Sequence, residues 1–156
     1  MDSVYVNRLL QALKNPDETV RNRATAEFWH LWFHQKGPQG AERLLESQTL
    51  LEKNDAEAAQ TILDALIKEE PDFAEAWNRR AVFYYLRQQY PEAIRDCEQT
   101  LELVPYHFGA LHGMGLCYAS LGNYREAIQY FRHALEIQPF SLINQRLILE
   151  CTAQLT

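Results

Sequence analysis

The chain has 156 residues, 47% hydrophobic and 23% charged, which is ordinary for one folded domain and argues against disorder. Its net charge of −6 argues against a dedicated nucleic-acid binder. The sequence has no run of about 20 apolar residues, so no transmembrane helix is predicted. The first residues also lack the pattern of a secretory signal. Three cysteines without a CxxC motif indicate the cytoplasm or another reducing compartment.

Residues 1–39 predict a hairpin of two helices. A first helix ends near Lys14, and the turn Asn-Pro-Asp at 15–17 lets Asp17 cap a second helix. The second helix carries four aromatic residues, Phe28, Trp29, Trp32 and Phe33. We interpret these aromatic residues as core rather than as binding surface. The hairpin faintly resembles a HEAT-type helical hairpin and is expected to cap the segment that follows.

From residue 40 onward the sequence repeats at a fixed period. Pro71, Pro105 and Pro139 are evenly spaced and mark this period, and aligning the segments on them brings three further columns into agreement. These columns are Ala59, Ala93 and Ala127; Leu63, Cys97 and Phe131; and Leu50, Tyr84 and Tyr118. Proline cannot continue a helix, so it sets the turn into the next unit. The alanines mark positions where two helices cross closely.

This pattern resembles the tetratricopeptide repeat (TPR), a helix–turn–helix unit of about 34 residues. The third unit agrees best, with Leu111, Met114, Gly115, Tyr118, Ala127, Phe131 and Pro139. The second unit has Arg80 in place of a leucine, and the first has Arg43, Glu46 and Ser47 in place of apolar or small residues. The resemblance covers roughly 40–140. It implies an all-α fold, an α-solenoid of about three TPR helix pairs with units 40–73, 74–107 and 108–141.

The helix pairs are expected at 41–52 and 56–69, 73–87 and 91–103, and 107–121 and 124–137. Gly122 is expected to end a helix through a left-handed cap. The C-terminal segment 141–156 predicts a capping helix at about 142–154 with Ser141 as its N-cap. This helix holds more apolar residues than one buried stripe needs. It therefore either packs against two neighbours or dimerises the protein, with an ordinary buried cap as the alternative.

Catalytic signatures are missing from the sequence, which has no P-loop and no HExxH, GxSxG or EF-hand motif. The glycines at 113 and 115 lack the third glycine of a dinucleotide fingerprint. His30 and His34 have the spacing of a metal-binding pair, but no third ligand lies near them in the sequence. We therefore predict a protein that is not an enzyme and that uses neither a cofactor nor a metal.

In the repeat family, the first helix of each pair lines a concave face that commonly holds an extended peptide or a partner helix. When the groove positions of the family are transferred to this sequence, the resemblance implies a groove lined by twelve residues. They are Leu44, Gln48, Leu51, Asn78, Arg79, Val82, Tyr85, Leu86, Gly109, His112, Gly113 and Leu116. Asn78, Arg79 and Tyr85 are expected to supply hydrogen bonds. Gly109 and Gly113 form a strip without side chains, which receives either a bulky group of the partner or a terminal helix folded back.

One variant of the family holds the terminal carboxylate of chaperone tails with lysine, arginine and asparagine. Leu44, Gln48, Arg79, Gly109 and Gly113 stand at those positions here, so a chaperone C-terminal tail is disfavoured. We predict a protein–protein interaction module or assembly scaffold that binds a peptide or helix in the concave groove. The alternatives are a structural subunit that self-associates, as a homodimer for example, or docks through its capping helices, and an accessory whose partner carries the chemistry.

The net charge is concentrated in residues 40–73, which carry three Lys or Arg against nine Asp or Glu. Two readings are open for this segment. It is either a solvated helical face or a surface that attracts basic partners.

Overall fold

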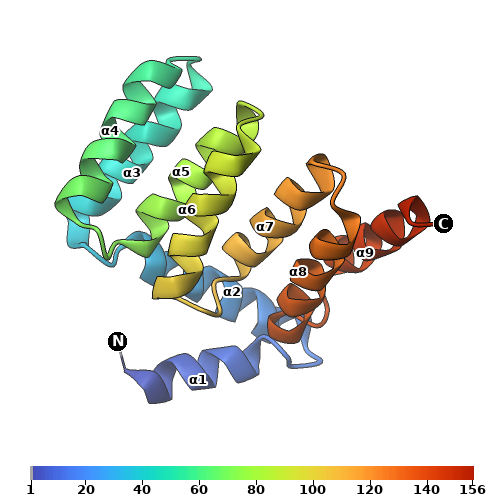
Figure 1. Cartoon of the computed structure of the whole chain (residues 1–156). Helices are drawn as coiled ribbons and strands as arrows, with labels where there is room; N and C mark the ends of the chain where they lie inside the picture. Colours follow the sequence, from blue (N-terminus) through green and yellow to red (C-terminus); the bar gives the residue numbers. More distant parts are fainter. Residues whose placement is uncertain (1) are drawn as a thin grey trace.

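The computed structural model describes residues 2–156, and within this range the chain forms nine α-helices and no strand (Figure 1). Their bounds are α1 Ser3–Ala12, α2 Glu18–Phe33, α3 Gly37–Glu52, α4 Ala56–Glu69, α5 Ala74–Leu86, α6 Tyr90–Leu103, α7 Phe108–Ser120, α8 Tyr124–Ile137 and α9 Leu142–Gln154. None of the helices in this range is both long and apolar enough to cross a bilayer. The all-α fold predicted from the sequence is confirmed.

Helices α3 to α8 form three antiparallel pairs that stand side by side in one row (Figure 1). Corresponding helices of the second and third pairs begin and end one sequence period apart, so the period of the sequence is also that of the solenoid. Helix α3, the first helix of the first pair, begins at Gly37 rather than at the predicted residue 41. Pro38 is tolerated in its first turn because an N–H at that position has no partner within the helix.

The turn inside each pair uses one backbone conformation three times. Asn54, Gln88 and Gly122 occupy the same position in successive units and have φ angles of 62°, 60° and 80°. The backbone N–H that follows each of them donates to a carbonyl five residues earlier, at 2.8–2.9 Å. This geometry is a left-handed helix cap, so the cap predicted at Gly122 is confirmed. The same cap reverses the chain at the end of each first helix.

Close crossings between paired helices depend on small residues. Ala59, Ala93 and Ala127 are completely buried. A Cβ atom added to Gly115 on α7 would lie 2.4 Å from the ring of Phe131 on α8, which is closer than two carbon atoms approach. The regular spacing of small residues along the sequence is therefore a steric requirement of the helix pairs.

Arg80 occupies the position where the repeat pattern has a leucine, and charge pairing replaces the apolar contact. Its guanidinium donates to both carboxylate oxygens of Asp96 at 2.8 and 3.0 Å, and to Asp64 at 2.9 Å. It also lies over the rings of Trp77 and Tyr84, 5.2 and 5.7 Å from their centroids. Because these partners come from α4, α5 and α6, the arginine ties the first repeat unit to the second.

The N-terminal helix α2 lies across the row, at the end where one pair connects to the next (Figure 1). Just beyond its C-terminal end, Lys36 pairs with Asp72 at 2.8 Å in the loop between the first two units. From the middle of α2, Thr25 accepts a hydrogen bond from Gln138 at 3.3 Å, just after α8, and nearer the N-terminal end of α2 the guanidinium of Arg21 lies over the ring of Phe140 at 4.1 Å. The helix therefore spans the solenoid. The boundaries 1–39, 40–140 and 141–156 stay a prediction.

Two of the predicted core aromatics, Phe28 and Trp32, are buried beneath α7. The ring of Trp32 stacks on His107, with centroids 3.9 Å apart. His107 Nδ1 accepts the N–H of Ala110, so Nε2 carries the ring proton that is donated to Glu75 at 3.0 Å. A single buried contact thus joins α2, α5 and α7.

Asn78 and Arg79 complete the surroundings of the Glu75 carboxylate, donating at 3.0 and 2.9 Å. Burial acts to raise the pKa of Glu75. The hydrogen bonds from His107 and Asn78 and the charge of Arg79 outweigh burial, and they hold the pKa below its ordinary value. The ionised carboxylate is therefore part of the folded structure.

The substitution Ala127→Leu tests the close crossing of α7 and α8. Because Ala127 is completely buried, the larger side chain should lower the free energy of unfolding by about 1–3 kcal/mol. Urea denaturation followed by circular dichroism measures the change. The control Ala26→Leu adds the same atoms at an exposed position of α2 and should change stability little. Equal stability of the two variants would contradict the alignment of the repeats.

Glu75 should make stability depend on pH. Since its folded pKa lies below its unfolded value of about 4.3, its contribution is present above that pH and is lost as the pH falls through the folded pKa. Glu75→Gln should cost about 1–3 kcal/mol at pH 7, and the difference from wild type should shrink below about pH 4. Urea titrations at several pH values measure this, with the exposed Glu102→Gln as control. A pH-independent difference would refute the prediction.

Candidate functional site

The first helices of the three pairs, α3, α5 and α7, lie next to each other and enclose two hollows. One lies between α3 and α5 and measures about 320 Å³, and the other lies between α5 and α7 and measures about 280 Å³. Val82 and Leu86 line both. The two hollows therefore meet along one ridge of α5, and we call them together the concave groove.

The structure brings eleven of the twelve predicted residues into this groove. Gln48, Leu51, Arg79, Val82 and Leu86 line the first hollow, and Asn78, Val82, Tyr85, Leu86, Gly109, His112, Gly113 and Leu116 line the second. Leu44 is the exception, because it is completely buried in the core cluster with Leu63 and Phe73. Leu44 does not reach the surface, so it is not part of the candidate site.

Sequence reasoning missed the small residues that form part of the groove wall. Ser47 lines the first hollow, and Ala81, Cys97 and Cys117 line the second. Burial raises the pKa of both thiols, that of Cys117 to about 11, which disfavours the nucleophilic thiolate form. The repeated small residue at positions 47 and 81, one period apart, was the signal that could have located this wall.

Three polar residues of the groove, Gln48, Asn78 and Arg79, are already partnered within the protein. Arg79 pairs with the buried carboxylate of Glu75 and reaches Gln48 Oε1 at 3.4 Å. Asn78 is buried and donates to the same carboxylate, so it contributes less to the surface than expected. Because Glu75 compensates the charge of Arg79, the groove presents hydrogen-bond donors without an uncompensated cation.

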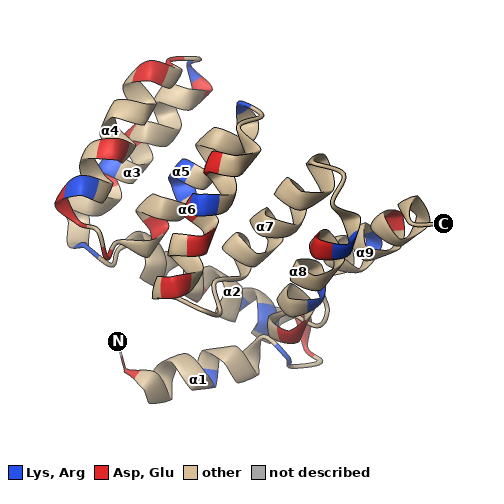
Figure 2. Ribbon diagram, in the orientation of Figure 1, with Lys and Arg blue, Asp and Glu red and all other residues tan. Residues whose placement is uncertain are grey.

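The ridge between the two hollows is apolar and exposed. On the ridge that separates the hollows, the side chains of Val82 and Leu86 are 45% and 65% exposed. The helix α7, which forms the far wall, carries no charged residue (Figure 2). At the end of the wall, His112 Nδ1 lies 2.7 Å from Asn144 Oδ1, so α9 closes this side of the groove.

The two glycines of the predicted strip have different surroundings. A Cβ atom on Gly109 would lie 2.6 Å from the indole of Trp29, so α2 fills the space beside this residue. A Cβ atom on Gly113 would approach only Cys97 Sγ, at 3.3 Å. The folded-back terminal helix therefore accounts for Gly109. Gly113 lines the second hollow.

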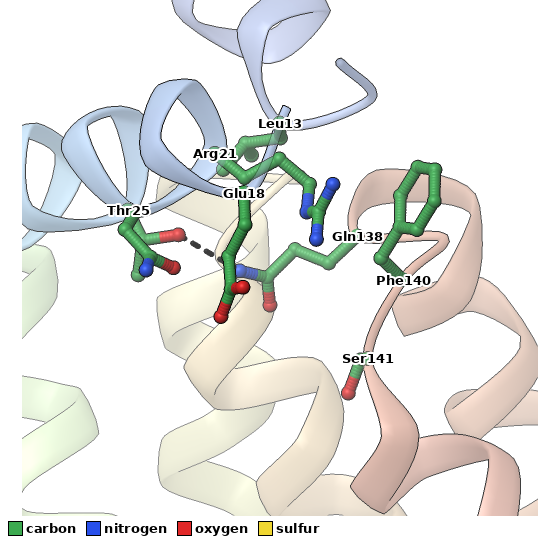
Figure 3. Close-up of a pocket in the computed structure, with 8 residues that line it drawn as sticks. Leu13, Glu18, Arg21, Thr25, Gln138, Phe140 and Ser141 are labelled. Carbon is green, nitrogen blue, oxygen red and sulfur yellow. Dashed lines mark hydrogen bonds between the residues drawn. The ribbon is translucent and has the colours of Figure 1, made fainter. Parts of the chain in front are cut away.

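A further hollow of about 300 Å³ lies between α2 and the turn from α8 to α9 (Figure 3). Arg21 crosses it, donates to the carbonyls of Asn15 and Pro16 at 2.9 and 2.7 Å, and lies over the ring of Phe140 at 4.1 Å. Since the charged group is occupied by these contacts, we interpret the hollow as a joint between α2 and the end of the solenoid.

The predicted histidine pair is exposed at the C-terminal end of α2, where His34 is the residue after the helix. The rings of His30 and His34 are 4.2 Å apart, and His34 Nδ1 lies 2.9 Å from the carbonyl oxygen of His30. Across residues 2–156, no three His, Cys, Asp or Glu side chains gather in the way that would hold a metal ion.

Comparison with known proteins gives the same fold. The sequence model described as "Tetratricopeptide repeat" matches residues 72–139. A TPR repeat-containing protein of Rhizobium etli is 29% identical over 135 residues, which cover 86% of this chain and 66% of that protein. Human Superkiller complex protein 3 is 32% identical over 69 residues, 44% of this chain and 4% of that protein. The chain thus spans less than two thirds of each relative.

Two solved complexes have the same arrangement of helices. The TPR2B domain of yeast Sti1, in complex with pHsp70, superposes with a TM-score of 0.66 at 24% identity, over 72% of this chain and 95% of that one. The first TPR domain of Spaghetti (RPAP3), bound to the HSP90 peptide SRMEEVD, has a TM-score of 0.70 at 16% identity, over 72% and 90%. The family model over residues 72–139 and the sequence matches to the relatives show that the chain contains tetratricopeptide repeats, and the solved domains share its fold.

Proposed function

We propose that this protein is an interaction module that binds a peptide or a helix of a partner protein in the concave groove. The observation that carries the proposal is the pair of hollows that meet at the exposed side chains of Val82 and Leu86. Apolar side chains left in water at a concave surface gain free energy when a partner covers them. The Sti1 and Spaghetti domains, which share the fold, were solved with pHsp70 and with an HSP90 peptide.

The groove selects for apolar anchors in the partner. The second hollow is lined mainly by carbon and sulfur atoms of Ala81, Tyr85, Cys97 and Leu116, so a large apolar side chain fits there better than a charged one. Arg79 and Gln48 lie at the first hollow, where they can bond the partner's backbone carbonyls. We therefore propose a partner segment with two apolar residues spaced to enter the two hollows.

The same geometry disfavours a ligand held by a terminal carboxylate. Arg79 is the cation of the groove, and it is paired with Glu75 at 2.9 Å. A carboxylate that enters the groove loses its hydrating water, and no unpaired positive charge in the groove would compensate for that loss. We propose that chaperone tails are poor ligands here.

Gly113→Leu tests the groove because its side chain would project into the second hollow. The helix should tolerate the change, since a mid-helix glycine costs about 1 kcal/mol relative to alanine and the new Cβ approaches only Cys97. Peptides selected from a random phage-displayed library on the wild-type protein serve as probes. Fluorescence anisotropy should show at least about a tenfold weaker binding to Gly113→Leu and to Leu86→Ser.

The control Leu103→Ser changes an exposed leucine outside the groove and should bind the selected peptides like wild type. The SRMEEVD peptide, measured in parallel, should bind more weakly than they do. If the selected peptides bind all the variants equally, the concave groove is not the binding surface.

A further inference from the structure

Helix α9 stands where the first helix of a fourth unit would stand. It begins and ends one period after α7, and it is the last helix of the row in Figure 1. Its inner side repeats that of α7. Cys151 and Asn144 are buried, as are Cys117 and Ala110 one period earlier. The inner side therefore packs against α8 in the way that α7 packs against α6.

The opposite side of α9 has no helix packed on it within residues 2–156. One position of the first helix is buried in every unit and is occupied by Ser47, Ala81 and Gly115 in turn. In α9 the same position holds Leu149, which is 71% exposed. Leu142, two helical turns earlier on the same face, is 77% exposed. The face is therefore apolar and uncovered.

The residue at position 149 indicates what can cover this face. In the third unit the second helix comes so close that a single Cβ on Gly115 would lie 2.4 Å from Phe131. A leucine at this position holds a neighbouring helix further away, so the second helix of an ordinary repeat does not fit. Helices that meet through leucine side chains pack at the wider end of the usual spacing of about 8–10 Å. The better occupant is a helix with a leucine face of its own.

We propose that this occupant is α9 of a second copy of the chain, packed antiparallel across a two-fold axis. A symmetric contact requires a face that complements itself, and α9 has one. Arg146 and Glu150 are both exposed beside Leu149. An axis near residue 148 places each Arg146 next to Glu150 of the other copy and brings the two Leu149 side chains together at the centre of the contact.

The distribution of charge favours this end of the molecule for self-association. Residues 108–156 carry three Lys or Arg and three Asp or Glu, so two such ends do not repel each other. The net charge lies instead in residues 40–73, in α3 and α4 at the other end of the row (Figure 2). The contact uses one helix of about 20 Å from each copy, so we expect a dimer that dissociates on dilution.

Sedimentation velocity over about three decades of concentration tests the dimer. The weight-average mass of the wild-type protein should rise from 18.2 kDa toward twice that value. Leu149→Glu should stay monomeric throughout. Val4→Glu replaces a residue of α1 that is 64% exposed, and it should dimerise like wild type. A wild-type protein that remains monomeric, or a Leu149→Glu variant that dimerises equally well, overturns the proposal.

Mixing two charge variants tests the two-fold geometry. Arg146→Glu and Glu150→Arg each place like charges across the axis, so each alone should dimerise at least about tenfold more weakly than wild type. An equimolar mixture pairs opposite charges in both contacts and should form heterodimers. Each variant loses the same pairing within its own helix, so helix stability cannot account for the recovery. Failure of the mixture to recover dimerisation overturns the antiparallel arrangement. Peptide binding in the groove is a separate readout that neither result affects.

Discussion

The groove depends on the buried carboxylate of Glu75. Removing a charge from water is costly unless partners compensate it, and here the compensation comes from His107 on one side and Arg79 on the other. His107 lies immediately before α7, and its ring stacks on Trp32 of α2. If α5, α7 or α2 shifted, the carboxylate would lose a partner. The pairing therefore fixes the separation of α5 and α7, which sets the width of the second hollow.

In the second unit, Arg80 forms polar contacts at the position where the third unit has the buried Met114. Arg80 bridges Asp64 and Asp96 on the outer side, while Glu75 joins His107 and Arg79 on the inner side. Directional bonds of this kind are satisfied in one register only. The apolar core holds the helix pairs together, and the two networks tie the second unit to the first and to the third.

The sequence alone predicted the repeat because its markers are steric. Proline and the small residues recur wherever a helix must end or two helices must cross, so their period locates six helices. The groove residues followed from their helix positions, apart from Leu44. That position lies at the contact between units, where Asn78 is also buried. The place of α2 was not predictable, because Trp29 meets Gly109 from a distant part of the chain and no local pattern encodes that contact.

The two proposed surfaces would reinforce each other. The groove lies on α3, α5 and α7, whereas α9 offers its outer side, so a dimer through α9 leaves both grooves open. A partner that carries two suitable segments on a flexible linker would then bind both copies, and its second contact would form at high effective concentration. Affinity for each groove can remain modest while such a partner binds tightly. The acidic residues 40–73 lie at the distal end of each copy, where they would add attraction for a partner with basic flanks.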